Sequence, residues 1–127
     1  MVVYSYVNCL VSSEVNIMRT PDLKTFMELF EKDFLQEPWD IVPNEGLPVE
    51  AYILPEIFTI EMNPRHIRSI DDFYFILAHE VVHWVFPDVG ETHADNIAAE
   101  AFINPKFRRL VRESFGIPDW VINKEGR

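Results

Sequence analysis

Two histidines stand four residues apart in the segment His79-Glu80-Val81-Val82-His83, and a glutamate directly follows the first of them. On an α-helix, residues i and i+4 lie on one face, so both imidazoles can point at the same ion. Glu80 lies about 100° round the helix from His79, beside that ion. The pattern therefore predicts a metal site on a helix. His79 and His83 are the expected ligands, and Glu80 is a base that takes a proton from metal-bound water.

The residues around this pattern predict a mostly buried helix over Ile70 to Phe86. The segment contains no Gly or Pro, and most of its side chains are apolar. Asp71 and Asp72 fall in the expected first turn, where the helix dipole favours negative charge. The alternative interpretation is a core helix with two hydrogen-bonded histidines, which would also require a partner for Glu80.

A catalytic zinc site usually has three protein ligands and keeps a fourth position for water, so a further ligand is expected downstream. Glu91 and His93 both lie near the start of a second predicted helix, which runs to Asn104. Glu91 and Asp95 share one face, whereas His93 lies about 200° from Glu91. If Glu91 binds the ion, Asp95 can accept a hydrogen bond from a ligand histidine. Two alternatives stay open: His93 as the third ligand, or Glu91 as a helix-start residue only, with Asp88 as N-cap.

HExxH followed by Glu-x-x-x-Asp resembles the gluzincins, the thermolysin-like clan of zinc metallopeptidases. The segment from Glu91 to Pro105 is similar to the ExxA(N/D)xxAAxxxxxP helix of the ImmA/IrrE peptidases, and the chain is about as long as the minigluzincins. The resemblance implies a Zn²⁺ site with three protein ligands: His79, His83 and Glu91. It also implies that Glu80 is the general base and that Asp95 supports a ligand histidine from the second shell.

The resemblance covers residues 73–105 and departs from thermolysin-like enzymes in the link between the two helices. Seven residues separate His83 from Glu91, where those enzymes have a longer connection. Pro87 disfavours helix at Phe86, and residues 87–90 form a credible turn. The short link is physically possible, and it leaves little room for additional turns.

Length and composition predict one domain over residues 1–127. Of the residues, 48% are hydrophobic and 13% are aromatic, which suffices for one core. The single cysteine, Cys9, excludes an internal disulfide and fits a reducing compartment. The N-terminus has no basic segment followed by a long apolar run, and no long stretch lacks polar groups. We therefore expect a cytoplasmic protein without a signal peptide or membrane span.

The charge of the chain limits its partners. A net charge of −10 disfavours nucleic acid as the principal partner. Residues 106–112 are the exception, with four basic and no acidic side chains. They form either a patch for an anionic partner or, more simply, a solvated helix face whose late cations suit the helix dipole.

The hydrophobic pattern elsewhere predicts a small sheet before the metal-binding helix and helices on either side of it. Strands are expected within residues 1–17, 49–54 and 57–62, with a further short strand at 39–42. Thr20 as N-cap and Pro21 at N1 predict a helix that ends near Glu37. Its expected core face is Leu23, Phe26, Met27, Phe30 and Phe34. Another helix is expected over 105–115, followed by a tail, 116–127, that wraps back on the domain.

This order predicts an α+β fold. The resemblance implies a compact zincin-like domain with a small mixed sheet packed on the active-site helix. The expected function is zinc-dependent hydrolysis of a peptide or protein substrate. The resemblance further implies that an edge strand holds the substrate. Residues 57–62 are the candidate, and the alternative is that they form an ordinary interior strand. Several side chains are candidates to stabilise the oxyanion: Tyr52, His66, Tyr74, His93 and Arg108. The alternative function is a zinc-bound regulatory protein with little or no turnover.

Overall fold

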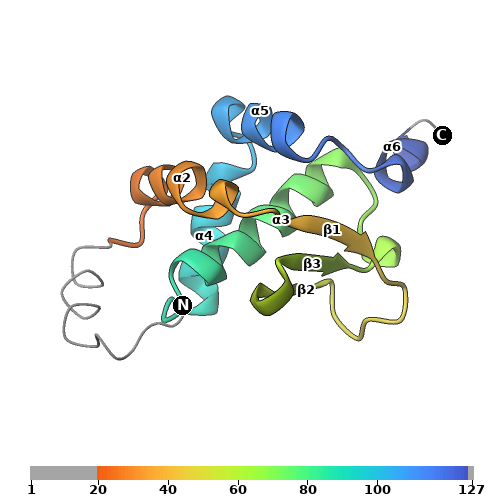
Figure 1. The fold of residues 1–127 in the computed structure, drawn as a ribbon, viewed down its shortest axis with the longest axis horizontal. Helices are drawn as coiled ribbons and strands as arrows, with labels where there is room; N and C mark the ends of the chain where they lie inside the picture. Colours follow the sequence, from red (N-terminus) through yellow and green to blue (C-terminus); the bar gives the residue numbers. More distant parts are fainter. Residues whose placement is uncertain (1–19, 126–127) are drawn as a thin grey trace.

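A three-stranded mixed sheet and five helices make up residues 20–125, the part of the chain that the computed structural model describes (Figure 1). The predicted α+β class is confirmed. The strands expected within residues 1–17, and Cys9, lie outside the described residues. Within the described part, no helix combines the length and hydropathy of a membrane span.

The sheet consists of β1 (Asp40–Pro43), β2 (Ala51–Leu54) and β3 (Thr59–Met62) in the order β1-β3-β2. β3 pairs in parallel with β1 and antiparallel with β2. The expectation that residues 57–62 form an edge strand is therefore wrong. The alternation that predicted a strand is real, since Ile60 and Met62 are fully buried. However, the alternation of apolar and polar residues indicates only which face of the strand is buried. It does not indicate whether the strand pairs with one neighbouring strand or two.

The first described helix, α2 (Leu23–Lys32), begins two residues later than predicted and continues into a 3₁₀ turn over Phe34–Gln36. Asp22 is the N-cap: its Oδ1 accepts a hydrogen bond of 2.8 Å from the Thr25 backbone N–H. Thr20 was therefore the wrong cap. A charged carboxylate accepts more strongly than a hydroxyl at the positive end of the helix dipole.

The hydrogen bond from the Thr25 N–H lowers the pKa of Asp22 in the folded protein. A lowered folded pKa adds stability above the unfolded value, and that stability is lost as the pH falls through the folded value. We expect Asp22→Asn to cost more stability at pH 7 than at pH 3, which urea unfolding at the two pH values measures. Glu28→Gln, on the exposed side of α2, is the control. An equal cost at both pH values would show that the carboxylate charge contributes nothing.

Aromatic side chains from four elements form the centre of the core. Phe26, Phe30 and Phe34 are fully buried along one face of α2 and its 3₁₀ extension, as the spacing predicted. Phe107 of α5 (Pro105–Ser114) packs on this row, with 4.9 Å between its ring centroid and that of Phe30. Phe107 also contacts Tyr74 of α3, at 6.4 Å between centroids. One ring thus contacts side chains of α2 and α3 from its place in α5.

Phe107→Ala is expected to lower the free energy of unfolding by about 3–5 kcal/mol, because it leaves a cavity where three helices meet. Equilibrium urea denaturation of the variant measures this loss. Ile103→Ala is the matched control, since Ile103 is 63% exposed and its truncation creates no internal cavity. A similar midpoint for both variants would contradict the central position of Phe107.

The central helix is α3 (Ile70–Val85), and α4 (Glu91–Ala101) follows it after a short turn. Ser69 caps α3 by accepting a hydrogen bond of 3.0 Å from the Asp72 N–H. α3 ends at Val85, ahead of Pro87, as the sequence predicted. Gly90 is the N-cap of α4 and Glu91 is its first helical residue, so the alternative with Asp88 as N-cap is wrong. This leaves the Glu91 side chain free of a capping role and directed at α3.

Three of the four basic side chains in segment 106–112 contact residues of other helices. Lys106 Nζ lies 3.0 Å from Glu31 of α2, and Arg108 Nη2 lies 2.7 Å from Asp71 at the start of α3. Arg112 Nη1 donates to the Tyr74 hydroxyl at 3.4 Å. These contacts attach α5 to the helices beneath it, so the segment is part of the scaffold rather than a free anion-binding patch.

The last described helix, α6 (Asp119–Glu125), packs against α3, and its Val121 is fully buried. In Figure 1, α6 and α4 lie at opposite sides of the molecule. Residues 116–125 of the tail thus fold back on the domain, at a distance from the helix that carries Glu91.

Candidate metal centre

The helical hairpin of α3 and α4 brings together the three side chains that the sequence singled out as ligands. His79 Nε2 lies 3.1 Å from Glu91 Oε1, and His83 Nε2 lies 3.3 Å from Glu91 Oε2. One ligand atom from each residue lies within 4.8 Å of the other two. The seven-residue link therefore suffices to bring Glu91 onto the face of α3 that carries the histidines.

The spacing of these atoms suits a small cation. Zinc binds histidine nitrogens and carboxylate oxygens at about 2.0–2.2 Å in a tetrahedral arrangement, which places neighbouring ligand atoms roughly 3.3 Å apart. The two His–Glu distances, 3.1 Å to Oε1 and 3.3 Å to Oε2 of Glu91, are close to that separation. The His79 and His83 rings are 4.7 Å apart and nearly perpendicular, at 83°. Both nitrogens can therefore converge on one point from different directions.

His83 supplies a separate indication that a cation belongs in the cluster. Its Nε2 atom is buried and makes no hydrogen bond of acceptable geometry within residues 20–125. The Glu91 oxygen 3.3 Å away satisfies only a distance criterion for an ion pair. A buried polar atom without a hydrogen bond is costly, and a metal bound to the nitrogen lone pair would remove that cost.

The electrostatics of the cluster follow from its crowded charges. The Glu80 carboxylate, 3.6 Å from Nδ1, raises the pKa of His79, with smaller contributions from Asp95 and Glu91, while burial opposes the rise. The charge of His83 lowers the pKa of Glu91. Without a metal the acidic neighbours thus favour protonated His79. A metal must displace that proton, because only neutral imidazole offers a lone pair.

Glu80 and Asp95 are placed differently from the arrangement that the resemblance implied. Glu80 Oε2 lies 3.6 Å from His79 Nδ1, the ring nitrogen that faces away from the cluster. Asp95 Oδ1 lies 3.2 Å from His79 Nε2, the same atom that Glu91 contacts. Asp95 does reach the HExxH helix, as expected. It contacts the nitrogen expected to bind the metal, whereas an outer support for His79 would contact the opposite nitrogen.

The remaining sequence candidates lie outside the cluster. His93 is exposed on α4 and is absent from the one metal-binding group found within the described residues. Tyr74 is buried beneath Arg108, whose guanidinium lies 4.4 Å from the centre of the tyrosine ring. Arg108 is held by Asp71 at the beginning of α3, so both side chains serve the scaffold. Tyr52 is exposed on β2, and His66 lines a separate pocket.

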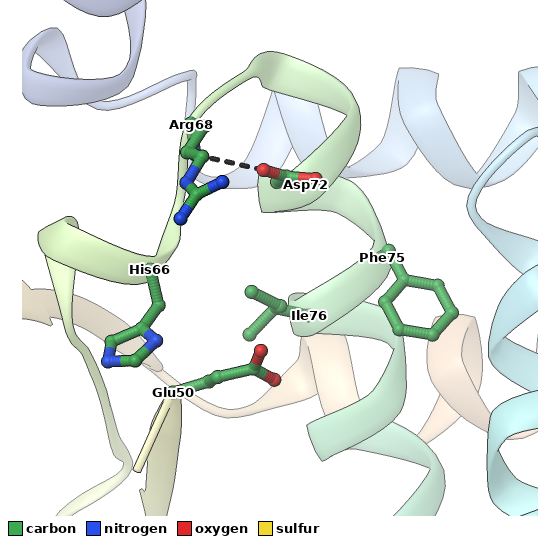
Figure 2. A pocket seen from close by; sticks show the side chains of 6 residues that line it. All are labelled: Glu50, His66, Arg68, Asp72, Phe75 and Ile76. Atoms are coloured by element: carbon green, nitrogen blue, oxygen red, sulfur yellow. Dashed lines mark hydrogen bonds between the residues drawn. The ribbon is translucent and has the colours of Figure 1, made fainter. Parts of the chain in front are cut away.

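That pocket, shown in Figure 2, shares no residue with the metal-binding group and includes Phe75 of α3. Its volume is about 300 Å³, and it is lined by the residue before β2, by α3 and by the segment between β3 and α3: Glu50, His66, Arg68, Asp72, Phe75 and Ile76. The Phe75 ring stacks on that of His79, with 6.3 Å between centroids and 19° between planes. Phe75 therefore separates the pocket from the ligands. Of the lining residues, only His66 was singled out from the sequence, because no local motif connects the others.

No protein-family model, curated protein or solved structure matches this chain. The case for a function therefore depends on the chemistry of the residues themselves. The fold and the site define a class: an α+β domain in which a helical hairpin presents a His₂Glu group, with a glutamate adjacent to the first histidine.

Proposed function

We propose that this protein is a zinc-dependent peptidase of the gluzincin type. His79, His83 and Glu91 hold the zinc ion. The observation that carries the proposal is the convergence of these side chains from two helices, at separations that match ligands of one tetrahedral ion. Two histidines and one carboxylate are also a donor set that catalytic zinc sites use.

Zinc in such a site lowers the pKa of a bound water and polarises the scissile carbonyl. Glu80 is the general base. Its carboxylate accepts a proton as the water oxygen bonds to the carbonyl carbon, and it returns that proton to the amine nitrogen as the carbon–nitrogen bond breaks. The Glu80 side chain is only 16% exposed. This burial limits the competition of bulk solvent for the carboxylate.

The substrate proposed is an extended peptide that adds to the edge of β2 on which no strand pairs within residues 20–125. The Asn63 N–H donates to the Glu50 carbonyl, and the Asn44 N–H donates to the Met62 carbonyl on the other side of β3. Since hydrogen-bonded pairs alternate in an antiparallel ladder, the backbone groups of Ala51 and Ile53 point away from β3. β2 also packs against α3. A strand along this edge would therefore lie beside the metal-binding helix.

The experiment that tests the proposal is metal analysis combined with a cleavage assay. Purified protein is expected to contain stoichiometric zinc and to cleave an unfolded protein such as casein. Dialysis against a chelator should abolish that cleavage, and added zinc should restore it. Protein that takes up no zinc would overturn both the metal site and the peptidase.

A second candidate function is a zinc-bound regulatory protein with little or no turnover. One observation favours it: Glu80 Oε2 lies 3.6 Å from His79 Nδ1, the ring nitrogen that faces away from the cluster. A carboxylate on that side supports the histidine and does not face a metal-bound water. Stoichiometric zinc without cleavage of any unfolded protein would support this second function.

A further inference from the structure

We propose that the pocket in Figure 2 binds a free α-amino acid with an apolar side chain. The inference goes beyond the proposed function, because no residue of the metal-binding group lines this pocket. Arg68 binds the carboxylate of the ligand, and Glu50 binds its ammonium group. In Figure 2 these two side chains extend from opposite walls into the same space.

Glu50 and Arg68 carry opposite charges that have no protein partner within residues 20–125. No ion pair or hydrogen bond is found there for the Glu50 carboxylate or the Arg68 guanidinium, although both groups line one pocket. A guanidinium forms strong paired hydrogen bonds with a carboxylate, and a carboxylate accepts hydrogen bonds from an ammonium group. A ligand of a single charge would be attracted by one wall and repelled by the other. A zwitterion satisfies both walls.

Backbone hydrogen bonds hold these walls in place. The buried Asn63 donates its N–H to the Glu50 carbonyl at 2.9 Å, and its own carbonyl accepts a hydrogen bond of 3.0 Å from the His66 N–H. The Arg68 N–H donates to Asp72 Oδ2 at 2.9 Å. The backbone on both sides of the pocket is therefore fixed without a bond between Glu50 and Arg68, so a ligand has little backbone to order when it binds.

Ile76 and Phe75 give the pocket an apolar side. Ile76 is 6% exposed, and the half-buried Phe75 stacks on His79. Ligand atoms that cover these side chains are removed from water, which favours an apolar side chain on the amino acid. The volume of about 300 Å³ is at the lower end of the range for pockets that hold small molecules. A single amino acid therefore fits the pocket better than an extended peptide.

The test is a titration of ¹⁵N-labelled full-length protein with L-leucine, followed through the amide signals. Saturable shifts are expected at Glu50 and within residues 66–76. The buffer contains a chelator, because a free amino acid also offers nitrogen and oxygen ligands to zinc. Two fragments serve as comparison probes: 4-methylpentanoate, which is leucine without its ammonium group, and 3-methylbutylamine, which is leucine without its carboxylate. Each should bind at least about tenfold more weakly than L-leucine.

Arg68→Ala and Glu50→Gln are each expected to weaken L-leucine binding by about 10- to 100-fold. Arg65→Ala and Glu45→Gln are the matched controls, since these side chains are 75% and 66% exposed and do not line the pocket. The amide spectrum of each variant verifies its fold. Absence of a saturable shift in wild type, equal affinity for either fragment, or unchanged binding by Arg68→Ala would each overturn the amino-acid site. Protein that takes up no zinc would overturn the proposed function and leave this inference intact.

Discussion

Replacing Glu80 by glutamine is expected to lower the rate of peptide hydrolysis by about 10²- to 10⁴-fold, the usual contribution of a general base. The amide cannot accept the proton of the attacking water, although it fills the same space. Glu80 is not among the three residues of the metal-binding group. Zinc content, measured by elemental analysis, should therefore remain stoichiometric in the variant.

This combination of lost turnover and retained metal separates a catalytic from a structural role for Glu80. Glu100→Gln is the control. It is the same glutamate-to-glutamine substitution, at a position that is exposed on α4 and outside the metal-binding group. If Glu80→Gln cleaved as fast as wild type, Glu80 would not be the base. If it lost zinc together with activity, Glu80 would instead support His79, whose Nδ1 lies 3.6 Å from it.

Glu91→Ala is expected to weaken zinc binding by more than the roughly 10- to 100-fold that loss of an outer-shell partner costs. Glu91 contacts both histidines, at 3.1 and 3.3 Å, so its removal leaves two ligands from α3 and an incomplete site. His93→Ala is the matched comparison: it removes a potential ligand two residues along the same helix and should leave zinc affinity unchanged.

Competition between each variant and a fluorescent zinc chelator measures both affinities under the same conditions. The opposite result, with zinc lost in His93→Ala and retained in Glu91→Ala, would mean that the third ligand is His93. Thermal unfolding in excess chelator provides the control for stability, since Glu91 and His93 are both exposed and neither contributes to the core.

Helix positions were predictable because the signals that set them are local. The start of α3 was expected from Asp71 and Asp72, and its end from Pro87. The aromatic spacing in α2 correctly predicted which rings are fully buried. The cap of α2 was wrong by two residues, because Thr20 and Asp22 both suit an N-cap and only the hydrogen bond to Thr25 distinguishes them.

Strand order and the surroundings of the cluster depend on contacts between distant segments. The segment 57–62 has the alternation of a strand. It is central in the sheet only because β1, which lies earlier in the chain, pairs with it, with Asp40 opposite Thr59. In the same way, Glu50 lines the pocket in Figure 2 together with Asp72 and Phe75, which lie later in the chain. No periodicity within one segment predicts such neighbours, because each segment is compatible with several pairings.

For the metal-binding cluster too, some features follow from local sequence and others from tertiary packing. The sequence by itself determined that His79 and His83 share a helix face and that Glu91 and Asp95 share another, because both pairs follow from 3.6 residues per turn. The tertiary structure alone decided that these faces meet, with Glu91 between the histidines and His93 turned away. It also decided which nitrogen of His79 each carboxylate contacts. That choice depends on the packing of α4 against α3, which sets side-chain distances that helical periodicity leaves open.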